Sequence, residues 1–518
     1  MRNPVILLGL AAGLIAFVVQ SGDVDSVDTV RRLQTTHSFW TSAPPVLPGD
    51  YPDFGLRGRG GKIYAWYGMG QSLLMLPADV VGTALENLPI FDGYNGNDPS
   101  VRNMIVAYST NILVNVLTAL VCLRFLTLLK FTRPQAVAGV LALLLCTTHL
   151  HYTQNMMENN YILLLTLAGF TYQYEWLLTG QRRALLIGAA AFGLNLLTRL
   201  TVAMDVLAGG VFLALVLVFA REPGMSIWKR IRTYTIIALP IYAVFLLIDR
   251  LYQYHRFGSF FNTYVAVFAQ QQHILHTSLP ANYPFENPFH VGLLGALFAP
   301  EKSIFLFDPL LMLTIVLVVV AWRRFPPEIK AYVVSGFLLL LIYICFYARY
   351  TVWSGDSAWG DRYVSTAAQW AAFISVPLLL RYRADLGRVV WTLGLGLVAG
   401  SALVQVASVA FWLPLELYQM TTLGHPTFVV GLRFQNIAAF ALGKMDAWGL
   451  TNSDMTTDPW DYVHITTWNF LPFVLRRVGE APAWVVRLAF AVWIAGLGML
   501  VAVLWRLQRA LSGRAFEA

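Results

Sequence analysis

Apolar runs long enough to cross a membrane recur along this chain and constrain its fold more than any other feature. A helix needs about 20 residues to cross a hydrocarbon core of about 30 Å. Of the 518 residues, 57% are hydrophobic and 12% are charged, whereas soluble proteins average about half and about a quarter. The sequence therefore predicts an all-α polytopic membrane protein.

The runs predict about twelve transmembrane helices. The run from Ala184 to Ala220 is too long for one span, so we expect a hairpin of two short spans that turns near Arg199. The first run has no small-x-small cleavage pattern after it, so we interpret it as an uncleaved helix. The remaining ten runs are 5–19, 104–129, 134–150, 160–178, 233–249, 304–321, 331–348, 364–380, 389–412 and 483–505.

The distribution of charge predicts the orientation of these helices. With the N-terminus in the cytoplasm, every short basic loop lies on the cytoplasmic face. The opposite, outer face then receives three long segments, 21–103, 250–303 and 413–482, which are rich in aromatic and polar residues. Loops of this kind commonly carry function, so we expect a site built from them against the helix ends.

The net charge of +8 belongs to these short loops, and no long basic run is present, so nucleic-acid binding is not expected. The three cysteines, Cys122, Cys146 and Cys345, all lie in apolar runs without a CxxC spacing. Neither a disulfide framework nor a zinc site is indicated.

Three acidic residues follow the first predicted helix in the stretch SGDVDSVD. Asp23, Asp25 and Asp28 lie within one or two turns of the expected membrane surface. They could cap a helix that begins here, because its free amides and its dipole both favour acidic groups. Alternatively, one of them could act as a general base that accepts a proton from a hydroxyl group.

A cationic, aromatic and glycine-rich stretch, GLRGRGGKIYAWYGMG, comes next and leads into an apolar segment interrupted by proline. We expect that segment to form an amphipathic helix at the membrane interface. Lys62, Tyr64 and Tyr67 could bind a lipid phosphate or a sugar, or the aromatic rings could simply anchor the chain in the interface.

Further candidates for substrate binding lie near the outer ends of later helices. Arg362 and Tyr363 precede the tenth span, where an arginine at a helix N-terminus could bind phosphate or could extend toward the membrane surface. Arg199 is expected to face a polar cavity or the surface rather than lipid, because burying its charge in lipid is costly. The other candidates are Glu158, Arg256, Tyr264, Glu301 and Lys302.

Several stretches together resemble the GT-C superfamily of integral-membrane glycosyltransferases, particularly the bacterial relatives of protein O-mannosyltransferases and of the lipid A aminoarabinose transferase. They are the acidic first loop, FGSFFNTYVAVF (257–268), LFAPEKSIFLFDPLLML (297–313) and WSGDSAWGDRYVSTA (353–367), in that order. The resemblance covers most of residues 20–370. The sequence departs from the family pattern in the first loop: many relatives carry an adjacent Asp-Glu pair, whereas this chain has Asp-Val-Asp.

The resemblance implies a transmembrane bundle with jaw helices in the outer loops. Residues 1–412 would form the GT-C-like catalytic module, including the first outer loop 21–103, and residues 413–518 would add an outer segment, the last span and a cytoplasmic tail. The catalytic acid carries most naturally onto Asp23, with Asp25 and Asp28 as contenders. Arg362 and Tyr363 would face the donor.

The implied activity is transfer of a sugar from a polyprenyl-phosphate-linked donor to a hydroxyl acceptor, with inversion, on the outer face of a bacterial inner membrane. Membrane lipids are the other expected partners. No cofactor is firmly indicated, although a divalent cation could take part. A transporter or lipid flippase is the alternative. Transporters usually carry charges within the membrane and paired broken helices in two related halves, whereas here the polar residues gather on one face and the sequence shows no repeat.

Overall fold

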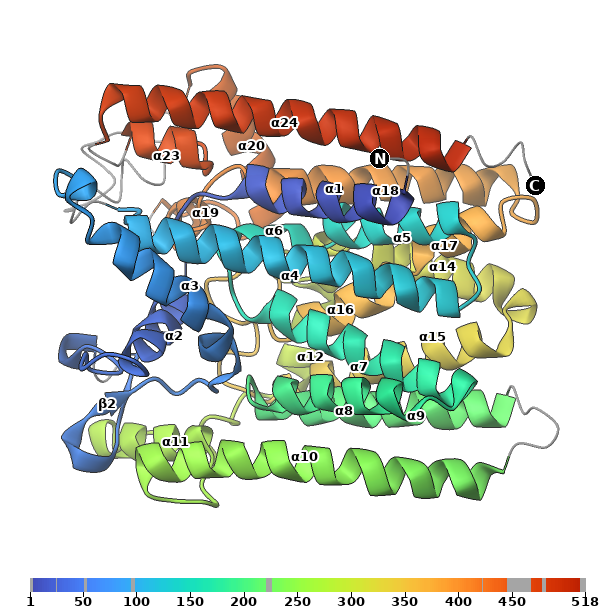
Figure 1. Cartoon of the computed structure of the whole chain (residues 1–518), viewed down its shortest axis with the longest axis horizontal. Helices are drawn as coiled ribbons and strands as arrows, with labels where there is room; N and C mark the ends of the chain where they lie inside the picture. Colours follow the sequence, from blue (N-terminus) through green and yellow to red (C-terminus); the bar gives the residue numbers. More distant parts are fainter. Residues whose placement is uncertain are drawn as a thin grey trace.

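Long helices lie side by side through most of the molecule, as the apolar runs predict (Figure 1). The computed structural model describes residues 3–24, 26–50, 54–94, 98–219, 226–421, 423–444, 467–477 and 481–512. The first helices along the chain are α1 (Pro4–Val19), α2 (Val27–Ser38), α3 (Gly70–Glu86), α4 (Val101–Leu128), α5 (Arg133–Cys146), α6 (His149–Asn155) and α7 (Asn159–Thr179).

The middle of the chain continues the same pattern. Its helices are α8 (Arg182–Leu196), α9 (Ala203–Phe219), α10 (Ile227–Phe257), α11 (Tyr264–Leu275), α12 (Phe289–Phe298), α13 (Ile304–Phe307), α14 (Leu310–Ala321) and α15 (Pro327–Tyr347). The last helices are α16 (Ser365–Ala372), α17 (Ser375–Arg381), α18 (Arg388–Ser408), α19 (Pro414–Thr421), α20 (Val429–Ala441), α23 (Leu471–Arg477) and α24 (Ala483–Ser512).

The prediction of a multi-pass, all-α membrane protein is confirmed, but the count of twelve spans is not. Within the described residues, six helices are long and apolar enough to cross a membrane, or seven if α5 and α6 form one bent span. Each of the other predicted spans is helical, but α1, α5, α8 and α14 are shorter than 18 residues. The predicted span 364–380 is divided into α16 and α17.

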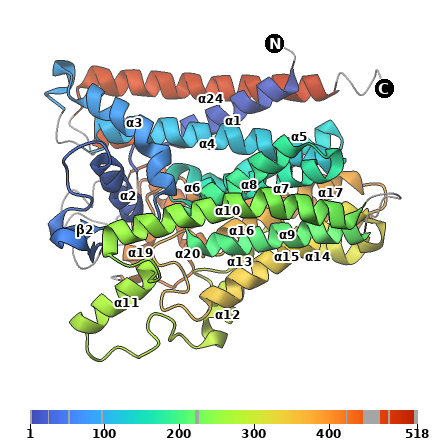
Figure 2. The same cartoon turned by 60° about the horizontal axis from the view of Figure 1, so that its bottom comes forward.

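The expected hairpin between Ala184 and Ala220 is present. Helices α8 and α9 are joined by a turn that contains Arg199 and a short 3-10 helix, Leu200–Val202. Asn195, near the end of α8, donates a hydrogen bond to the carbonyl of Ile162 in α7, which ties the hairpin to the bundle. The turn lies at the end of the bundle that also carries α2 and α3 (Figure 2).

The first outer segment contains the only strands among the described residues. β1 (Leu56–Arg57) pairs antiparallel with β2 (Ile63–Tyr64). The connecting turn needs the left-handed backbone of Gly60 and Gly61, whose φ values are 67° and 73°. The predicted interfacial helix is α3, which begins only after this hairpin.

A bend of 54° separates α5 from α6, and a side chain from another helix pair explains it. Asp308, between α13 and α14, accepts hydrogen bonds from the backbone N of Thr148 at 2.7 Å and from its hydroxyl at 2.9 Å. The carboxylate thus caps the first turn of α6, where the direction of the chain changes.

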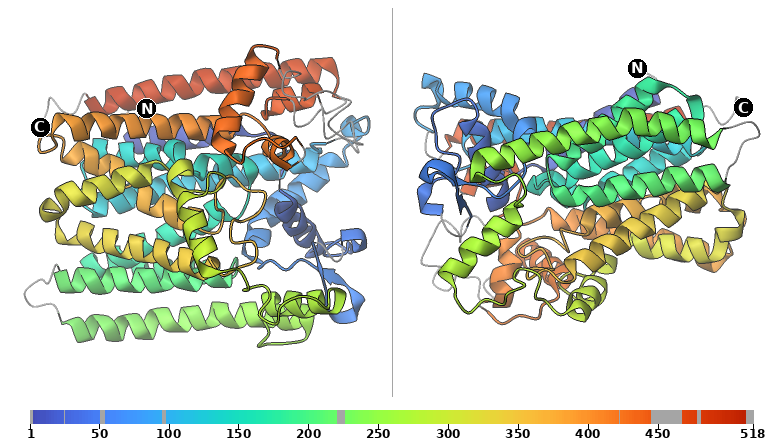
Figure 3. Two further views of the ribbon diagram at one scale, coloured as in Figure 1. Left: turned by 180° about the vertical axis from the view of Figure 1, so that it is seen from behind. Right: turned by 90° about the horizontal axis from the view of Figure 1, so that it is seen from below.

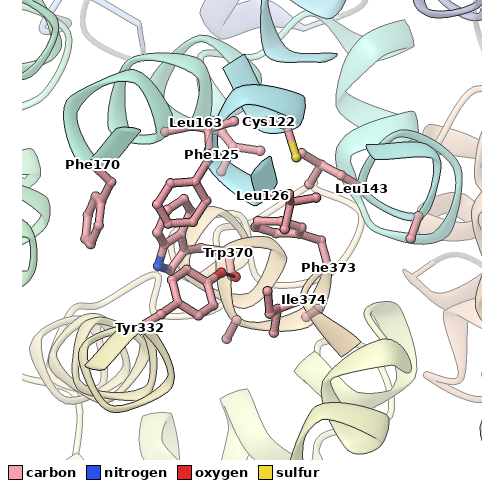
Figure 4. Packing of buried hydrophobic residues seen from close by; sticks show 14 of the residues in the cluster. Cys122, Phe125, Leu126, Leu143, Leu163, Phe170, Tyr332, Trp370, Phe373 and Ile374 are labelled. Carbon is pink, nitrogen blue, oxygen red and sulfur yellow. Dashed lines mark hydrogen bonds between the residues drawn. The ribbon is translucent and has the colours of Figure 1, made fainter. Parts of the chain in front are cut away.

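Aromatic side chains pack at the centre of the bundle (Figure 4). The ring of Trp370 lies 4.5 Å from that of Phe170, 5.3 Å from Phe125 and 5.0 Å from Tyr332, measured between centroids. In a membrane, close packing rather than exclusion of water holds helices together. This cluster joins α4, α7, α15 and α16 into one core.

The first and last helices lie together. The indole N of Trp493 in α24 donates a hydrogen bond to the carbonyl of Val18 in α1, at 2.8 Å. α1 begins and α24 ends at the same end of the bundle, away from α2 and α3 (Figure 3). The last helix therefore packs in the same bundle as the first, and the end with α2 and α3 corresponds to the predicted outer face.

Candidate functional site

A cavity of about 150 Å³ lies at the predicted outer end, where α2 approaches the ends of several bundle helices. Its volume is several times the space that a water molecule occupies in the liquid. Five charged side chains line it: Asp28, Arg32, Glu158, Arg199 and Arg362. We call these five residues the cavity cluster. The aromatic walls include Trp66, Tyr67, Tyr264, Phe268, Tyr347, Tyr350 and Tyr363.

Asp28 occupies the first turn of α2 and points into the cavity. One carboxylate oxygen accepts a hydrogen bond from the hydroxyl of Tyr67, and the other forms an ion pair with Nη1 of Arg362 at 2.6 Å. Burial, followed by the charge of Asp28, raises the pKa of Tyr67 well above its ordinary value, so Tyr67 stays a donor. The side chain of Asp28 is 16% exposed and can be reached from the cavity.

Glu158, just before α7, joins two arginines. It forms ion pairs with Nη2 of Arg32 at 2.7 Å and with Nη2 of Arg199. Burial opposes ionisation of Glu158, but Arg32, Arg199 and Arg362 outweigh it and hold its pKa well below the usual range. A carboxylate with such a low pKa is a weak base, so Glu158 is suited to fixing the arginines rather than to accepting a proton.

The cavity cluster has hydrogen-bond donors that its own carboxylates do not use. Three arginines face two carboxylates, which leaves one positive charge in excess. Within the described part of the chain, Nη1 of Arg32 and Nε of Arg362 are buried and have no hydrogen-bond partner. A buried donor without a partner costs free energy, so these two atoms are the ones in the cluster that an anionic ligand could stabilise.

The loop that carries Arg362 is held by Lys302. Its ammonium donates hydrogen bonds to three carbonyls of this loop, those of Asp356 at 2.5 Å, Ala358 at 2.9 Å and Gly360 at 3.3 Å. Burial lowers the pKa of Lys302 to about 8. Lys302 was predicted to bind substrate, but it is buried and does not line the cavity, since its donors are used on the backbone.

Arg362 and Tyr363 are brought together with the other side chains of the site, as predicted. Asn159 donates to the carbonyl of Arg362 at 2.7 Å, which fixes the backbone at this point. The ring of Tyr363 stacks on Tyr347, with centroids 4.4 Å apart and planes 6° apart. Arg199 lies 5.4 Å from the Tyr363 ring centroid, so the predicted polar surroundings of Arg199 are confirmed.

Lys62, Tyr64 and Arg256 lie elsewhere. Lys62 and Tyr64 line a second cavity, of about 430 Å³, between α2, α3 and the end of α10. Arg256 is 2% exposed and donates to the carbonyls of Ala65 at 2.5 Å and Tyr67 at 2.9 Å. Arg256 therefore positions the segment that carries Tyr67 instead of contacting the first cavity.

The three acidic residues of the first loop have separate positions. Asp23 does not line the cavity, and its carboxylate accepts from the backbone N of Val24 at 2.6 Å and from the amide of Asn103 at 3.1 Å. These bonds are those of a residue that orders the chain between α1 and α2. Asp25 lies outside the described residues. Asp28 is the described acid of this group that reaches the cavity.

Sequence reasoning missed two contributors. Arg32 was not singled out, although it stands four residues after Asp28 on α2 and therefore shares its face. Tyr347, at the end of α15, gave no signal because it lies within an apolar run. Tyr264 and Arg199, named only among the weaker candidates, both line the cavity.

The residues of the cavity do not fit a divalent cation. Among the described residues, no group of three or more His, Cys, Asp and Glu side chains is placed to hold a metal ion. The two carboxylates of the cavity, Asp28 and Glu158, already face arginines.

No family model and no curated protein matches this chain. Among solved structures, the chain is similar to ArnT from Cupriavidus metallidurans bound to undecaprenyl phosphate, with 13% identity, a TM-score of 0.44, and 98% of this chain and 77% of that chain covered. It is also similar to the Archaeoglobus fulgidus oligosaccharyltransferase tethered with an acceptor peptide, with 15% identity, a TM-score of 0.47, and 89% and 62% covered. Both scores are below 0.5, so these likenesses carry no conclusion about the function of this chain.

Proposed function

We propose that this chain is an inverting GT-C-type glycosyltransferase, which moves a sugar from a polyprenyl-phosphate-linked donor to a hydroxyl group. The observation that carries the proposal is the cavity cluster, in which a carboxylate lies beside arginines whose buried donors have no partner among the described residues. Such an arrangement can hold a phosphate and accept a proton within one small space.

The phosphate of the donor would be bound by Arg32 and Arg362. Their free N–H groups, Nη1 and Nε, offer charge-assisted hydrogen bonds to phosphate oxygens. Arg199 adds a third positive charge, and Glu158 keeps Arg32 and Arg199 in place. As the bond between the sugar and the phosphate breaks, the electron pair stays on the phosphate oxygen, and these arginines stabilise the added negative charge.

Asp28 would be the general base. Its carboxylate accepts the proton of the acceptor hydroxyl while the hydroxyl oxygen attacks the anomeric carbon from the side opposite the phosphate. The products are the glycosylated acceptor and a polyprenyl phosphate, with the proton on Asp28. A single displacement of this kind inverts the configuration at the anomeric carbon, and placement near the ends of the helices lets the polyprenyl chain stay in the bilayer.

The same geometry supports a location for the reaction. The cavity lies at the end of the bundle opposite the short basic loops, which the positive-inside rule assigns to the cytoplasm. We therefore place the reaction on the outer face of the membrane, which in a bacterium is the periplasmic side of the inner membrane.

Substitution of Asp23 and of Asp28 tests this proposal. In purified protein supplied with a panel of polyprenyl-phosphate-linked sugars, release of polyprenyl phosphate should fall about 100-fold to 10,000-fold in Asp28→Asn, the usual worth of a general base. Asp23→Asn is the matched control and should stay within about twofold, because asparagine orders a turn as well as aspartate.

A well-folded Asp28→Asn protein with normal turnover would remove Asp28 from the mechanism. If Asp23→Asn loses turnover instead, Asp23 is the base, as the family resemblance implies. If no donor in the panel is used by the unaltered protein, the donor class is wrong.

A further inference from the structure

A long groove lies on the side of the bundle at the end opposite the cavity cluster. Its volume is about 810 Å³, and it is lined by Val5, Leu117, Leu120, Val121, Leu123, Arg124, Thr127, Leu128, Phe131, Arg133 and Tyr172. These residues come from α1, α4, the start of α5 and α7. The walls are mostly apolar, and the two arginines lie toward the basic-loop end of α4.

The length of the groove matches one leaflet of a bilayer. Along α4 it extends from Leu117 to Leu128, which is about 17 Å at 1.5 Å per residue. Half of a hydrocarbon core of about 30 Å has nearly this depth. Leu117 is 40% exposed, so this wall is open to the acyl chains of the membrane.

The two arginines give the groove a positive end. Arg124 is 49% exposed and forms a bidentate ion pair with Glu175, in which its Nε donates at 2.7 Å. Its Nη1 makes no hydrogen bond within the described residues. Arg133 is exposed and has no ion-pair partner among the residues that the structure describes.

Two neighbouring features add to this positive potential. Arg133 is the first residue of α5, so the N-terminal end of the α5 dipole lies at the groove. The guanidinium of Arg381 lies 5.4 Å from the ring centroid of Phe131, and its Nη1 is buried without a hydrogen-bond partner in the described chain. Three arginines thus surround this end of the groove, where Glu175 is the acid that faces Arg124.

We propose that this groove binds an anionic phospholipid from the leaflet at the basic-loop end of the bundle. The phosphate contacts Arg124 and Arg133, and an acyl chain lies along Leu117 and Leu120. Basic pockets between transmembrane helices favour anionic headgroups, and each arginine near the surface adds to the attraction. The apolar walls select a lipid over a free phosphate ion.

Lipid retention by the purified protein tests this inference. After delipidation in detergent, the protein is mixed with phosphatidylglycerol or with phosphatidylcholine of the same chains, and bound lipid is counted by native mass spectrometry. The unaltered protein should retain one phosphatidylglycerol that phosphatidylcholine does not replace. Arg133→Gln should weaken this retention about fivefold, the effect of one basic residue near a lipid headgroup.

Two further variants make the result specific. Leu117→Trp should reduce retention by filling the apolar wall, whereas Arg323→Gln should not change it, because Arg323 is exposed at the same end but does not line the groove. Equal retention in Arg133→Gln and unaltered protein would overturn the proposal. An equal loss of retention in Arg323→Gln would also overturn it, because the effect would then come from general charge. Displacement of the lipid by inorganic phosphate would overturn it as well, because the groove would then be a phosphate site.

Discussion

Two clusters of arginine and carboxylate differ in whether their hydrogen bonds are complete. In the cavity cluster, Arg362 pairs with Asp28 yet keeps a buried Nε without a partner in the described chain. In the second cluster, between α19 and α20, Arg433 forms a bidentate pair with Glu416, in which Nε and Nη2 each lie 2.6 Å from a carboxylate oxygen. We call this second arrangement the closed cluster.

In the closed cluster, each of the three guanidinium nitrogens of Arg433 donates a hydrogen bond. Nη1 of Arg433 donates to the carbonyls of Ala407, Ser408 and Phe411, and both Arg433 and Glu416 are 0% exposed. Asn436 adds a further hydrogen bond to Glu416 at 2.9 Å. Similar residue types are therefore paired in two ways: the pairing in the closed cluster holds α19 and α20 together, whereas the cavity cluster keeps donors without a partner in the described chain.

The largest further effect is expected when the closed cluster is broken. Arg433→Met leaves Glu416 buried without its partner, which should lower the free energy of unfolding by about 3 to 5 kcal/mol. Thermal unfolding in detergent would measure this loss. The double variant Arg433→Met with Glu416→Leu should recover much of it, because no unpaired charge then remains. Failure of the double variant to recover stability would contradict a purely structural role for the pair.

A smaller and pH-dependent effect is expected from Glu158. Its pKa in the folded protein lies well below its ordinary value of 4.5 because of Arg32, Arg199 and Arg362. The stabilisation is therefore complete above about pH 4.5 and is lost as the pH falls through the folded value. Glu158→Gln should cost about 2 to 3 kcal/mol at pH 7, and its difference from the unaltered protein should shrink in acid.

Measurement of the free energy of unfolding of both proteins from pH 3 to about 7 would check this pH dependence. A difference between Glu158→Gln and unaltered protein that stays constant over the range would mean that the arginines do not stabilise ionised Glu158. Glu301→Gln is a suitable control, because Glu301 has no ion-pair partner among the described residues.

The smallest effect of this set is expected at Arg362. Arg362→Ala should weaken binding of a short polyprenyl phosphate by about 1.5 to 3 kcal/mol, the value of a hydrogen bond to a charged group. Arg362→Lys should recover only part of it, since an ammonium cannot reproduce the planar guanidinium. Titration with farnesyl phosphate would measure the affinity, and unchanged affinity in folded Arg362→Ala would assign Arg362 to holding Asp28 alone.

The same comparison explains which parts of the site could be predicted. Arg362 was predicted from the family resemblance and from its place before the tenth span, and Glu158 was predicted as a charged residue at the outer face. Lys302 and Arg256 were predicted for the same reason as Glu158, but their donors are bound to backbone carbonyls. A sequence records that a charge is present, but not whether its hydrogen bonds are satisfied.

The choice among the first-loop acids shows the same limit. Asp23 was favoured because it follows the first helix most closely, and it remains a prediction as the family's catalytic acid. In the structure, Asp23 bonds to Val24 and Asn103, while Asp28 reaches Arg362, which is 334 residues away in sequence. Only packing of α2 against the loop before α16 could distinguish them.

By itself, the sequence determined the class of the protein, the course of its helices and the asymmetry of its two ends. These features follow from local composition, because each apolar run must satisfy its own backbone as a helix. The tertiary structure decided which charges meet, which are already satisfied and which face a cavity, because those contacts join residues far apart in the chain. The incomplete pairing at Arg32 and Arg362 is therefore a property of the fold and not of any segment.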